Sequence, residues 1–285
     1  MAGNFVQLHN HTHYSLLDGA SKVPDLVKRV KELGMPAVGI TDHGNMHGAY
    51  ELWRAAVDSG VKPIIGIEAY VTPETARQDK TRVSWDTNWT PVPGHARNPD
   101  DVSGGGLITH LTMWAENDEG LVNLIKASSV ANLEGRVMRY PRMDKEVLST
   151  YSKGVIASSG CPSGIIQTRL RLGQFDEALR AAGEFQDIFG KDNFYIELMD
   201  HGLSIESKVT GDLLTIAKKL GAPLLATNDS HYVMEADKDA QDAMLCINSG
   251  ATLDDPNRFK FEGSGYYIKS AEEMRELFKD HPDAC

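Results

Sequence analysis

The sequence predicts an α/β fold, built either as an α/β barrel or as a doubly wound sheet. Short apolar runs alternate with amphipathic segments along most of the 285 residues. Most of the seven predicted strands are followed by a predicted helix, which is the pattern of repeated strand–helix units. A content of 41% hydrophobic and 24% charged residues is typical of a soluble globular protein.

The strands and helices can be assigned in order along the chain from their periodicity. Strands are expected at residues 5–11, 37–43, 62–71, 107–115, 154–160, 193–201 and 223–233. Helices are expected at residues 23–33, 49–60, 118–131, 163–172, 175–189 and 204–221. Gly34 and Gly60 suit the left-handed position that ends a helix, so they mark the ends of the first two.

A last helix is expected after Ser270, which is a suitable N-cap because Glu272 and Glu273 follow in the first turn. The chain then stops without a closing element, so we expect it to be a piece of a longer protein. The long segment 73–106 is rich in Pro, Asn, Asp, Gly and Trp and shows no periodicity. A segment of that kind in a compact domain is usually functional or mobile.

Charge and cysteine content narrow the classes of function. With 29 basic and 40 acidic residues the net charge is −11, which argues against unaided binding to nucleic acid. Cys161, Cys246 and Cys285 are too few for a disulfide framework, which indicates a reducing compartment. No apolar stretch approaches the ~20 residues of a membrane span, and the N-terminus is not a secretory signal. These features predict a cytoplasmic protein that is not bound to a membrane.

Side chains that bind metals recur at one end of the predicted strands, where barrel enzymes build their active sites. They are His9, His11, Asp18, His43, Glu68, His110, Cys161, Asp229 and His231. Imidazoles, carboxylates and one thiol suit Zn²⁺ and can also bind Mn²⁺ or Fe²⁺. Nine ligands exceed the need of one ion, so we expect two to three divalent transition-metal ions, an arrangement suited to phosphoester hydrolysis.

Other roles remain open for several of these residues when each is taken alone. A single His-x-His pair can be fortuitous. Cys161 can be an inert buried thiol, and Asp229 can cap a turn. Asp42, next to His43, either accepts backbone hydrogen bonds in a turn or orients a metal ligand.

Several segments together resemble the PHP (polymerase and histidinol phosphatase) domain of bacterial DNA polymerase III alpha subunits. Their sequences are most similar to those of actinobacterial members. They are LHNHTHYSLLDG (8–19), GITDHGN (39–45), GIEAYV (66–71), THLTMWAEN (109–117), SSGCPSG (158–164), ELMDHGL (197–203), TNDSHYV (227–233) and DPNRFKFEGSGYYIKSAEEM (255–274). The resemblance covers essentially the whole chain. It implies one PHP domain over 1–285, in which residues 250–285 lead toward a polymerase region.

The resemblance also implies a fold and an activity. The fold would be a distorted seven-stranded (β/α) barrel with its metal centre at the C-terminal face of the strands. All nine family ligand positions are filled here, which favours an active metal-dependent 3′→5′ exonuclease that proofreads for the attached polymerase. The residues expected to carry catalysis are Asp18, His43, Glu68 and Asp229. Zinc is the expected metal, with manganese or iron as alternatives.

The partners implied are a DNA 3′ end, the rest of the alpha subunit and other replisome subunits. Two alternatives remain: an idle PHP module that stabilises the polymerase or docks a partner, and a phosphatase of the histidinol-phosphate type. Cys161 is expected to act as a thiolate ligand and not as a nucleophile. Trp85 and Trp89 in segment 73–106 could stack on unpaired bases or pack against the barrel.

The remaining histidines and two arginines are not expected to bind metal. Arg169 and Arg171 are expected on a helix surface, where either could meet the DNA backbone. His201, which closes a predicted strand, is expected to support a ligand or contact phosphate. Surface or loop positions are expected for His13, His47, His95 and His281.

Overall fold

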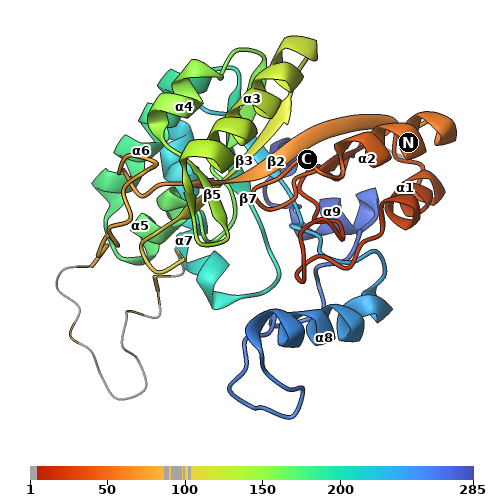
Figure 1. Cartoon of the computed structure of the whole chain (residues 1–285). Helices are drawn as coiled ribbons and strands as arrows, with labels where there is room; N and C mark the ends of the chain where they lie inside the picture. Colours follow the sequence, from red (N-terminus) through yellow and green to blue (C-terminus); the bar gives the residue numbers. More distant parts are fainter. Residues whose placement is uncertain (1–4, 87–89, 91–97, 99, 102–103) are drawn as a thin grey trace. The chain divides into compact units, whose positions relative to one another are not determined.

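The computed structural model describes residues 5–86, 90, 98, 100–101 and 104–285 (Figure 1). Its strands and helices confirm the α/β class. By internal contacts the chain forms two units, each described here by itself. Unit 1 comprises Met1–Ile67, Met199–Leu203 and Ala226–Cys285, and unit 2 comprises Glu68–Leu198 and Ser204–Leu225.

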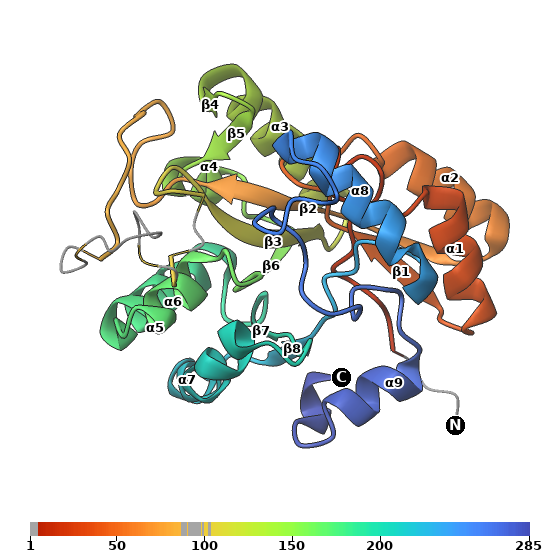
Figure 2. The same cartoon turned by 90° about the horizontal axis from the view of Figure 1, so that it is seen from below.

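Unit 1 contains the first helices and the C-terminal region. Its elements are α1 (Val23–Glu32), β1 (Ala37–Ile40), α2 (Ala49–Ser59), the first part of β2 (Lys62–Val71), η1 (Glu235–Asp237), α8 (Lys238–Ser249), α9 (Ala271–Leu277) and η2 (Pro282–Ala284). Strand β1 pairs in parallel with β2, from Ala37 opposite Lys62 to Ile40 opposite Ile65. Helices α1 and α2 contact each other and lie side by side (Figure 2).

Helix α1 forms because its apolar side chains repeat with helical spacing. Val23, Leu26, Val27 and Val30 are all buried, and their spacing of i, i+3, i+4 and i+7 places them on one face. A proline in the first turn suits the helix start, where no amide hydrogen is needed. The helix is followed by Gly34 at φ 69°, in the left-handed conformation that the sequence predicted.

Two predicted strands of unit 1 are mostly irregular. Residues 5–11 make only isolated parallel bridges, Gln7 with Val38 and Asn10 with Ser230. The Asn10 side-chain amide donates to the carbonyls of Gln7 and Gly39, so side-chain bonds replace part of a regular ladder. The predicted strand 223–233 is reduced to β8 (Leu224–Ala226). Asp229 has φ 43°, which breaks the extended conformation.

Unit 2 is built on a mixed sheet. The strand order is β4-β5-β2-β3-β6-β7-β8. The strands not yet bounded are β3 (Thr109–Ala115), β4 (Arg136–Val137), β5 (Tyr140–Met143), β6 (Val155–Ser158) and β7 (Phe194–Leu198). β2 with β5 and β6 with β7 are parallel, whereas β3 with β6 and β4 with β5 are antiparallel. The short strands β4 and β5 were not predicted.

The helices of unit 2 agree closely with the prediction. They are α3 (Asp118–Glu134), α4 (Lys145–Thr150), α5 (Ile165–Arg171), α6 (Phe175–Phe189) and α7 (Ser204–Leu220). Helix α6 has the predicted bounds, and only α4 was missed. Helices α5, α6 and α7 contact one another and form one group in both views (Figures 1 and 2).

A buried Arg171 and a half-buried Arg169 correct the prediction that both are surface residues. Arg171 is 3% exposed and its Nε donates to the carbonyl of Asp100 at 2.9 Å. Burial lowers the pKa of Arg171 to about 10. The guanidinium of Arg169 lies over the indole of Trp85, 4.5 Å from the ring centroid. The two side chains therefore hold Trp85 and Asp100 next to α5.

Trp85 itself is 3% exposed, and its carbonyl accepts from Gln174 Nε2 at 2.7 Å. Of the two roles left open for this indole, local packing is therefore confirmed. Trp89 and His95 lie outside the described residues. Among the described residues, no helix is both long and apolar enough to span a bilayer.

Candidate metal centre

Unit 1 brings together six of the nine predicted ligands. They are His9, His11, Asp18, His43, Asp229 and His231. The Nε2 atoms of His9 and His11 lie 3.3 and 3.1 Å from Asp229 Oδ1. The Nε2 atoms of His43 and His231 lie 2.8 and 3.5 Å from Asp18 Oδ2. We call these six residues the His/Asp cluster.

The His/Asp cluster is buried and compact. His9 and His11 are 0% exposed and His231 is 2% exposed. The ring of His11 lies 4.1 Å from that of His43 and 4.3 Å from that of His231, between centroids. Ligand atoms of His11, His43 and His231 lie within 4.8 Å of one another, as do those of His9, His11 and Asp229. The spacing suits coordination of more than one cation.

Hydrogen bonds fix the tautomer of His11. Ser15 Oγ donates its one hydrogen to Asp42 Oδ1 at 2.9 Å and accepts from the His43 backbone N–H at 3.1 Å. Its 2.8 Å contact with His11 Nδ1 must therefore be donated by the imidazole. The proton of neutral His11 then lies on Nδ1, and Nε2 presents a lone pair to the cluster.

His231 is held in the same tautomer by a different partner. Its Nδ1 lies 2.8 Å from the carbonyl oxygen of Asp229. A carbonyl only accepts, so Nδ1 carries the hydrogen and Nε2 is the lone-pair atom. This arrangement, in which the second ring nitrogen donates to an outer group, is the usual form of a metal-binding histidine.

The charges of the His/Asp cluster suit cations. Burial, reinforced by the nearby His43 and His231, lowers the pKa of His11 to about 3, so this imidazole is neutral near pH 7. Burial would raise the pKa of Asp18, but His231 and His43 outweigh it and hold the pKa well below the usual value. The pKa of Asp229 is likewise lowered, because His9, His231 and His11 outweigh burial. A neutral His11 therefore coexists with two ionised carboxylates, whereas burial is outweighed by Asp18 and Asp229 at His231, whose pKa is raised.

Residues around the cluster determine where its ligands point. Asp42 accepts from Thr12 N at 2.7 Å and from Thr12 Oγ1 at 2.8 Å, besides Ser15. Asp42 therefore accepts a backbone hydrogen bond, which was one of its two expected roles, and it reaches His11 only through Ser15. Gln241 of α8 donates to the carbonyl of Asp18 at 3.1 Å. The prediction missed Ser15 and Gln241; the His11–Ser15 spacing inside one motif was a usable signal, whereas nothing in the sequence marked Gln241.

Unit 2 brings together the other three predicted ligands. Glu68 lies on β2, His110 on β3 and Cys161 just after β6. His110 Nδ1 lies 3.2 Å from Glu68 Oε1 and 3.4 Å from Cys161 Sγ. Glu68 and Cys161 are 1% and 6% exposed. Within this unit a carboxylate, an imidazole and a thiol thus meet around one point.

The turn that carries Cys161 is well held. Gly160 has φ 80°, a conformation that favours glycine. Its carbonyl accepts from Gln167 Nε2 at 2.6 Å, and the Cys161 carbonyl accepts from the N–H of Gly164 at 2.8 Å. These bonds fix the position of the thiol relative to α5.

The remaining described histidines lie apart from these ligands or support them. His201 stacks on Tyr266 at 4.0 Å, and its Nε2 lies 3.0 Å from the Asn228 carbonyl, next to Asp229. It therefore supports the backbone that presents a cluster carboxylate. His47 is exposed, and His13 and His281 are half-buried, in keeping with surface roles.

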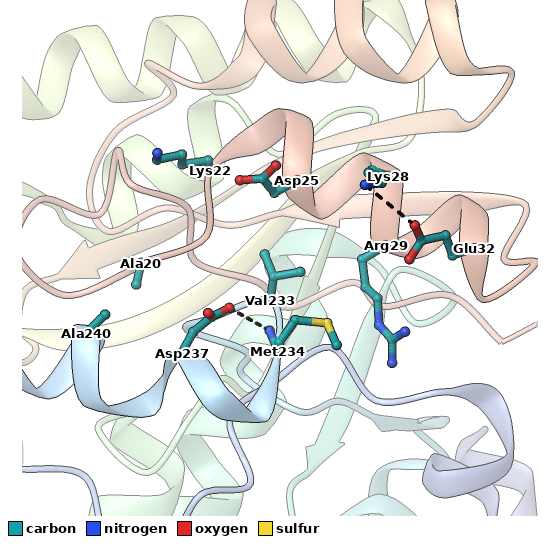
Figure 3. A pocket seen from close by; sticks show the side chains of 10 residues that line it. All are labelled: Ala20, Lys22, Asp25, Lys28, Arg29, Glu32, Val233, Met234, Asp237 and Ala240. Atoms are coloured by element: carbon teal, nitrogen blue, oxygen red, sulfur yellow. Dashed lines mark hydrogen bonds and ion pairs between the residues drawn. The ribbon is translucent and has the colours of Figure 1, made fainter.

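Unit 1 also has a cavity of about 420 Å³ between α1 and the segment 233–240 (Figure 3). Its charged lining groups are Lys22, Asp25, Lys28, Arg29, Glu32 and Asp237. Lys28 and Glu32 face each other at 4.0 Å on one wall. Positive and negative groups balance, and none of the nine predicted ligands is among its described lining residues. The cavity is therefore distinct from the candidate metal centre.

We expect Ser15→Ala to weaken metal binding without unfolding the chain. The substitution removes the acceptor of His11 Nδ1–H, so the ring loses the contact that fixes its tautomer. Loss of such an outer contact typically costs about 10–100-fold in metal affinity. The measurement is a Zn²⁺ titration of metal-stripped protein against a competing chelator. Ser129→Ala, which removes a hydroxyl bonded only to the Ile125 carbonyl on exposed α3, is the control; equal affinities in both variants would contradict the assignment.

Comparison with known proteins gives a consistent result. The PHP domain family pattern matches residues 7–201. The chain is 53% identical over 283 residues to a DNA polymerase III subunit alpha of Mycobacterium leprae, covering 99% of this chain and 23% of that protein. It is 54% identical over 282 residues to that of Saccharopolyspora erythraea, covering 99% and 24%. The chain thus spans about a quarter of the length of these relatives.

The chain is also similar to a solved structure. A putative metal-dependent phosphoesterase from Bifidobacterium adolescentis is 15% identical, with a TM-score of 0.44 and coverage of 97% of this chain and 96% of that chain.

Proposed function

The chain belongs to the PHP domain family, and we propose that it is the metal-dependent 3′→5′ exonuclease module of a bacterial DNA polymerase III alpha subunit. The polymerase context rests on the relatives, which are polymerase subunits matched over nearly the whole chain. The natural partners would then be a DNA 3′ end, the rest of the alpha subunit and other replisome subunits, and the compartment would be the cytoplasm.

The observation that carries the proposal is the His/Asp cluster. Two of its imidazoles have their Nδ1 protons engaged by outer acceptors, and two carboxylates remain ionised despite burial. Gathering such groups in a core is unfavourable unless a ligand compensates for it. An idle scaffold has no need of this arrangement, so the cluster favours an active centre.

The ligand set fits two to three divalent ions. His9, His11, His43, His231, Asp18 and Asp229 would hold ions in unit 1, and Glu68, His110 and Cys161 would contribute from unit 2. The mixture of nitrogen, oxygen and thiolate donors suits zinc best, with manganese or iron as alternatives. Bound ions would supply Lewis acidity toward a phosphodiester and its leaving oxygen.

The chain's own residues prepare the site for that chemistry. Asp18, His43, Glu68 and Asp229 are the proposed catalytic residues because three carboxylates and one imidazole lie among the candidate ligands. Ser15 and Asp42 keep His11 in the tautomer whose Nε2 faces inward. Cys161 serves as a soft ligand, and no step requires it as a nucleophile.

The proposal predicts that a primer is shortened from its 3′ end, and faster when its terminus is mismatched. An unpaired end enters a buried centre more readily than a stacked one, so fraying becomes the source of selectivity. The measurement follows a 5′-end-labelled primer on a template, with the full-length polypeptide, divalent ions and no nucleotides. EDTA should stop the reaction.

The alternatives give different outcomes in the same experiment. A scaffold or docking module would shorten neither primer under any metal supplement. A small-molecule phosphatase would leave both primers intact while hydrolysing histidinol phosphate.

A further inference from the structure

A group of aromatic side chains lies directly beside the His/Asp cluster in unit 1. Phe261 meets the ring of His231 edge-on, with centroids 4.7 Å apart and planes at 75°. Tyr266 lies 4.7 Å from Phe261, and Phe259 lies 6.0 Å from Phe261. We call Phe259, Phe261 and Tyr266 the aromatic wall. It places three π-systems next to a candidate metal ligand.

The outer part of the aromatic wall is open to solvent. Phe259 is 63% exposed, Phe261 is half-buried, and Tyr266 is 8% exposed. Exposure therefore increases from Tyr266 through Phe261 to Phe259. Phe259 is exposed and Phe261 is half-buried, so the outer faces of these two rings can meet a ligand.

The segment that carries the wall is anchored at both ends. Arg258 binds Asp242 of α8 through both carboxylate oxygens, with Nη2 2.6 Å from Oδ2. At the other end Asn228 Nδ2 donates to the Gly265 carbonyl at 2.8 Å, and Tyr232 pairs with Tyr267 in a parallel bridge. The wall is therefore a fixed surface.

One exposed cation, Lys260, lies among the rings of this segment and suits a nucleic-acid ligand, whereas Arg258 is paired with Asp242. The sequence Arg258-Phe259-Lys260-Phe261 alternates cations with aromatic rings in a chain whose net charge is −11. Lys260 is exposed between the two phenylalanines. Aromatic rings interleaved with cations are typical of surfaces that bind single strands, since every base offers a π-face and every nucleotide a phosphate.

Resting on the exonuclease function proposed above, we propose that the aromatic wall stacks on the unpaired 3′-terminal base of DNA. Stacking there would place the adjacent phosphodiester at the His/Asp cluster, while Lys260 approaches a phosphate. A paired base remains stacked in the duplex and cannot use the wall. The aromatic wall would thus make the enzyme selective for frayed over paired 3′ ends.

Photocrosslinking tests where the 3′-terminal base binds, and it requires no hydrolysis. A single-stranded oligonucleotide with 5-iodouracil as its 3′-terminal base is bound to the full-length polypeptide in EDTA and irradiated, and the crosslinked peptide is identified by mass spectrometry. We expect the crosslink within residues 258–266. The same base placed at the 5′ end should not crosslink there.

Kinetics then separate binding from chemistry. Phe259→Leu with Phe261→Leu keeps apolar bulk but removes both π-faces, so the fold should persist. Loss of a stacked base should raise KM for a thymine-ended single strand about fivefold to a hundredfold, with a smaller change in kcat. A strand ending in an abasic nucleotide should be cleaved equally by both forms. Tyr50→Leu with Trp53→Leu, an exposed aromatic pair on α2, is the matched control and should behave as wild type.

The outcomes distinguish this proposal from the function on which it rests. Crosslinking at the wall without hydrolysis by the wild type would refute the exonuclease and leave the wall as a base-binding surface. Normal hydrolysis with unchanged KM in the leucine variant, together with a crosslink elsewhere, would refute base stacking on the aromatic wall. The proposed exonuclease function would not be affected.

Discussion

Replacement of Asp229 with Asn is expected to abolish hydrolysis while the chain stays folded. Asp229 Oδ1 is the point on which the Nε2 atoms of His9 and His11 converge. Asparagine has the same shape but no charge, so the cluster loses one of its two carboxylates. The backbone should tolerate the change, because φ is 43° here and asparagine adopts the left-handed region more readily than most residues.

Two measurements check this expectation. The nuclease rate on a 3′-mismatched primer should fall below detection. The rise in melting temperature on adding metal should also shrink, because an ion at 100 times its Kd stabilises the native state by about 2.7 kcal/mol only if the site is intact. Asp25→Asn, an exposed acid on α1 that lines the separate cavity, should change neither quantity. If Asp229→Asn retained the activity and metal uptake of the wild type, the His/Asp cluster would not be the catalytic centre.

Gly120→Ala is expected to destabilise unit 2 severely. A Cβ at Gly120 would lie 1.6 Å from the carbonyl oxygen of Gly154, and backbone cannot move aside as a side chain can. This close approach packs the first turn of α3 against the residues that enter β6, and Asn117 Oδ1 caps the same turn by accepting from Gly120 N–H. We expect the free energy of unfolding to fall by about 3 kcal/mol or more, the upper range for overpacking.

Denaturation in urea measures the effect, and Gly183→Ala is the control. Gly183 lies inside α6, where the nearest atom to an added Cβ is Leu220 Cδ2 at 3.9 Å. Alanine there should stabilise the helix by about 0.5–1 kcal/mol, because glycine loses more conformational freedom on folding. Midpoints that shift in the same direction in both variants would show that the contact between Gly120 and Gly154 is not as close as described.

Amphipathic helices were predictable because their signal is local. The apolar stripe of α1 and the bounds of α6 follow from residue spacing alone. Ser270 also caps α9 as the sequence indicated, and the structure adds a capping box with Glu273. Short elements such as β4, β5 and α4 were missed, since two to six residues carry too little periodicity to distinguish them from loops.

Extended segments were harder to predict because a strand depends on its neighbours. Residues 5–11 have the apolar pattern of a strand, yet Asn10 binds the backbone at Gly39 through its side chain and the ladder is interrupted. The long segment shows the same limit: Trp85 is buried because Arg169 and Gln174, more than 80 residues away, cover it. No local pattern reports such contacts.

For the candidate site, the sequence by itself supplied the nine candidate ligands and the kind of metal they would suit, because residue type decides donor chemistry. The tertiary structure decided which atoms of those ligands face inward. Ser15 meets Asp42 and His43 across 27 and 28 residues of chain, and this contact places the proton of His11 on Nδ1. Burial then keeps His11 neutral, while the neighbouring imidazoles outweigh burial and keep Asp18 and Asp229 ionised. Proton positions and charge states depend on three-dimensional neighbours and on exclusion of water, and neither is encoded in the spacing of a motif.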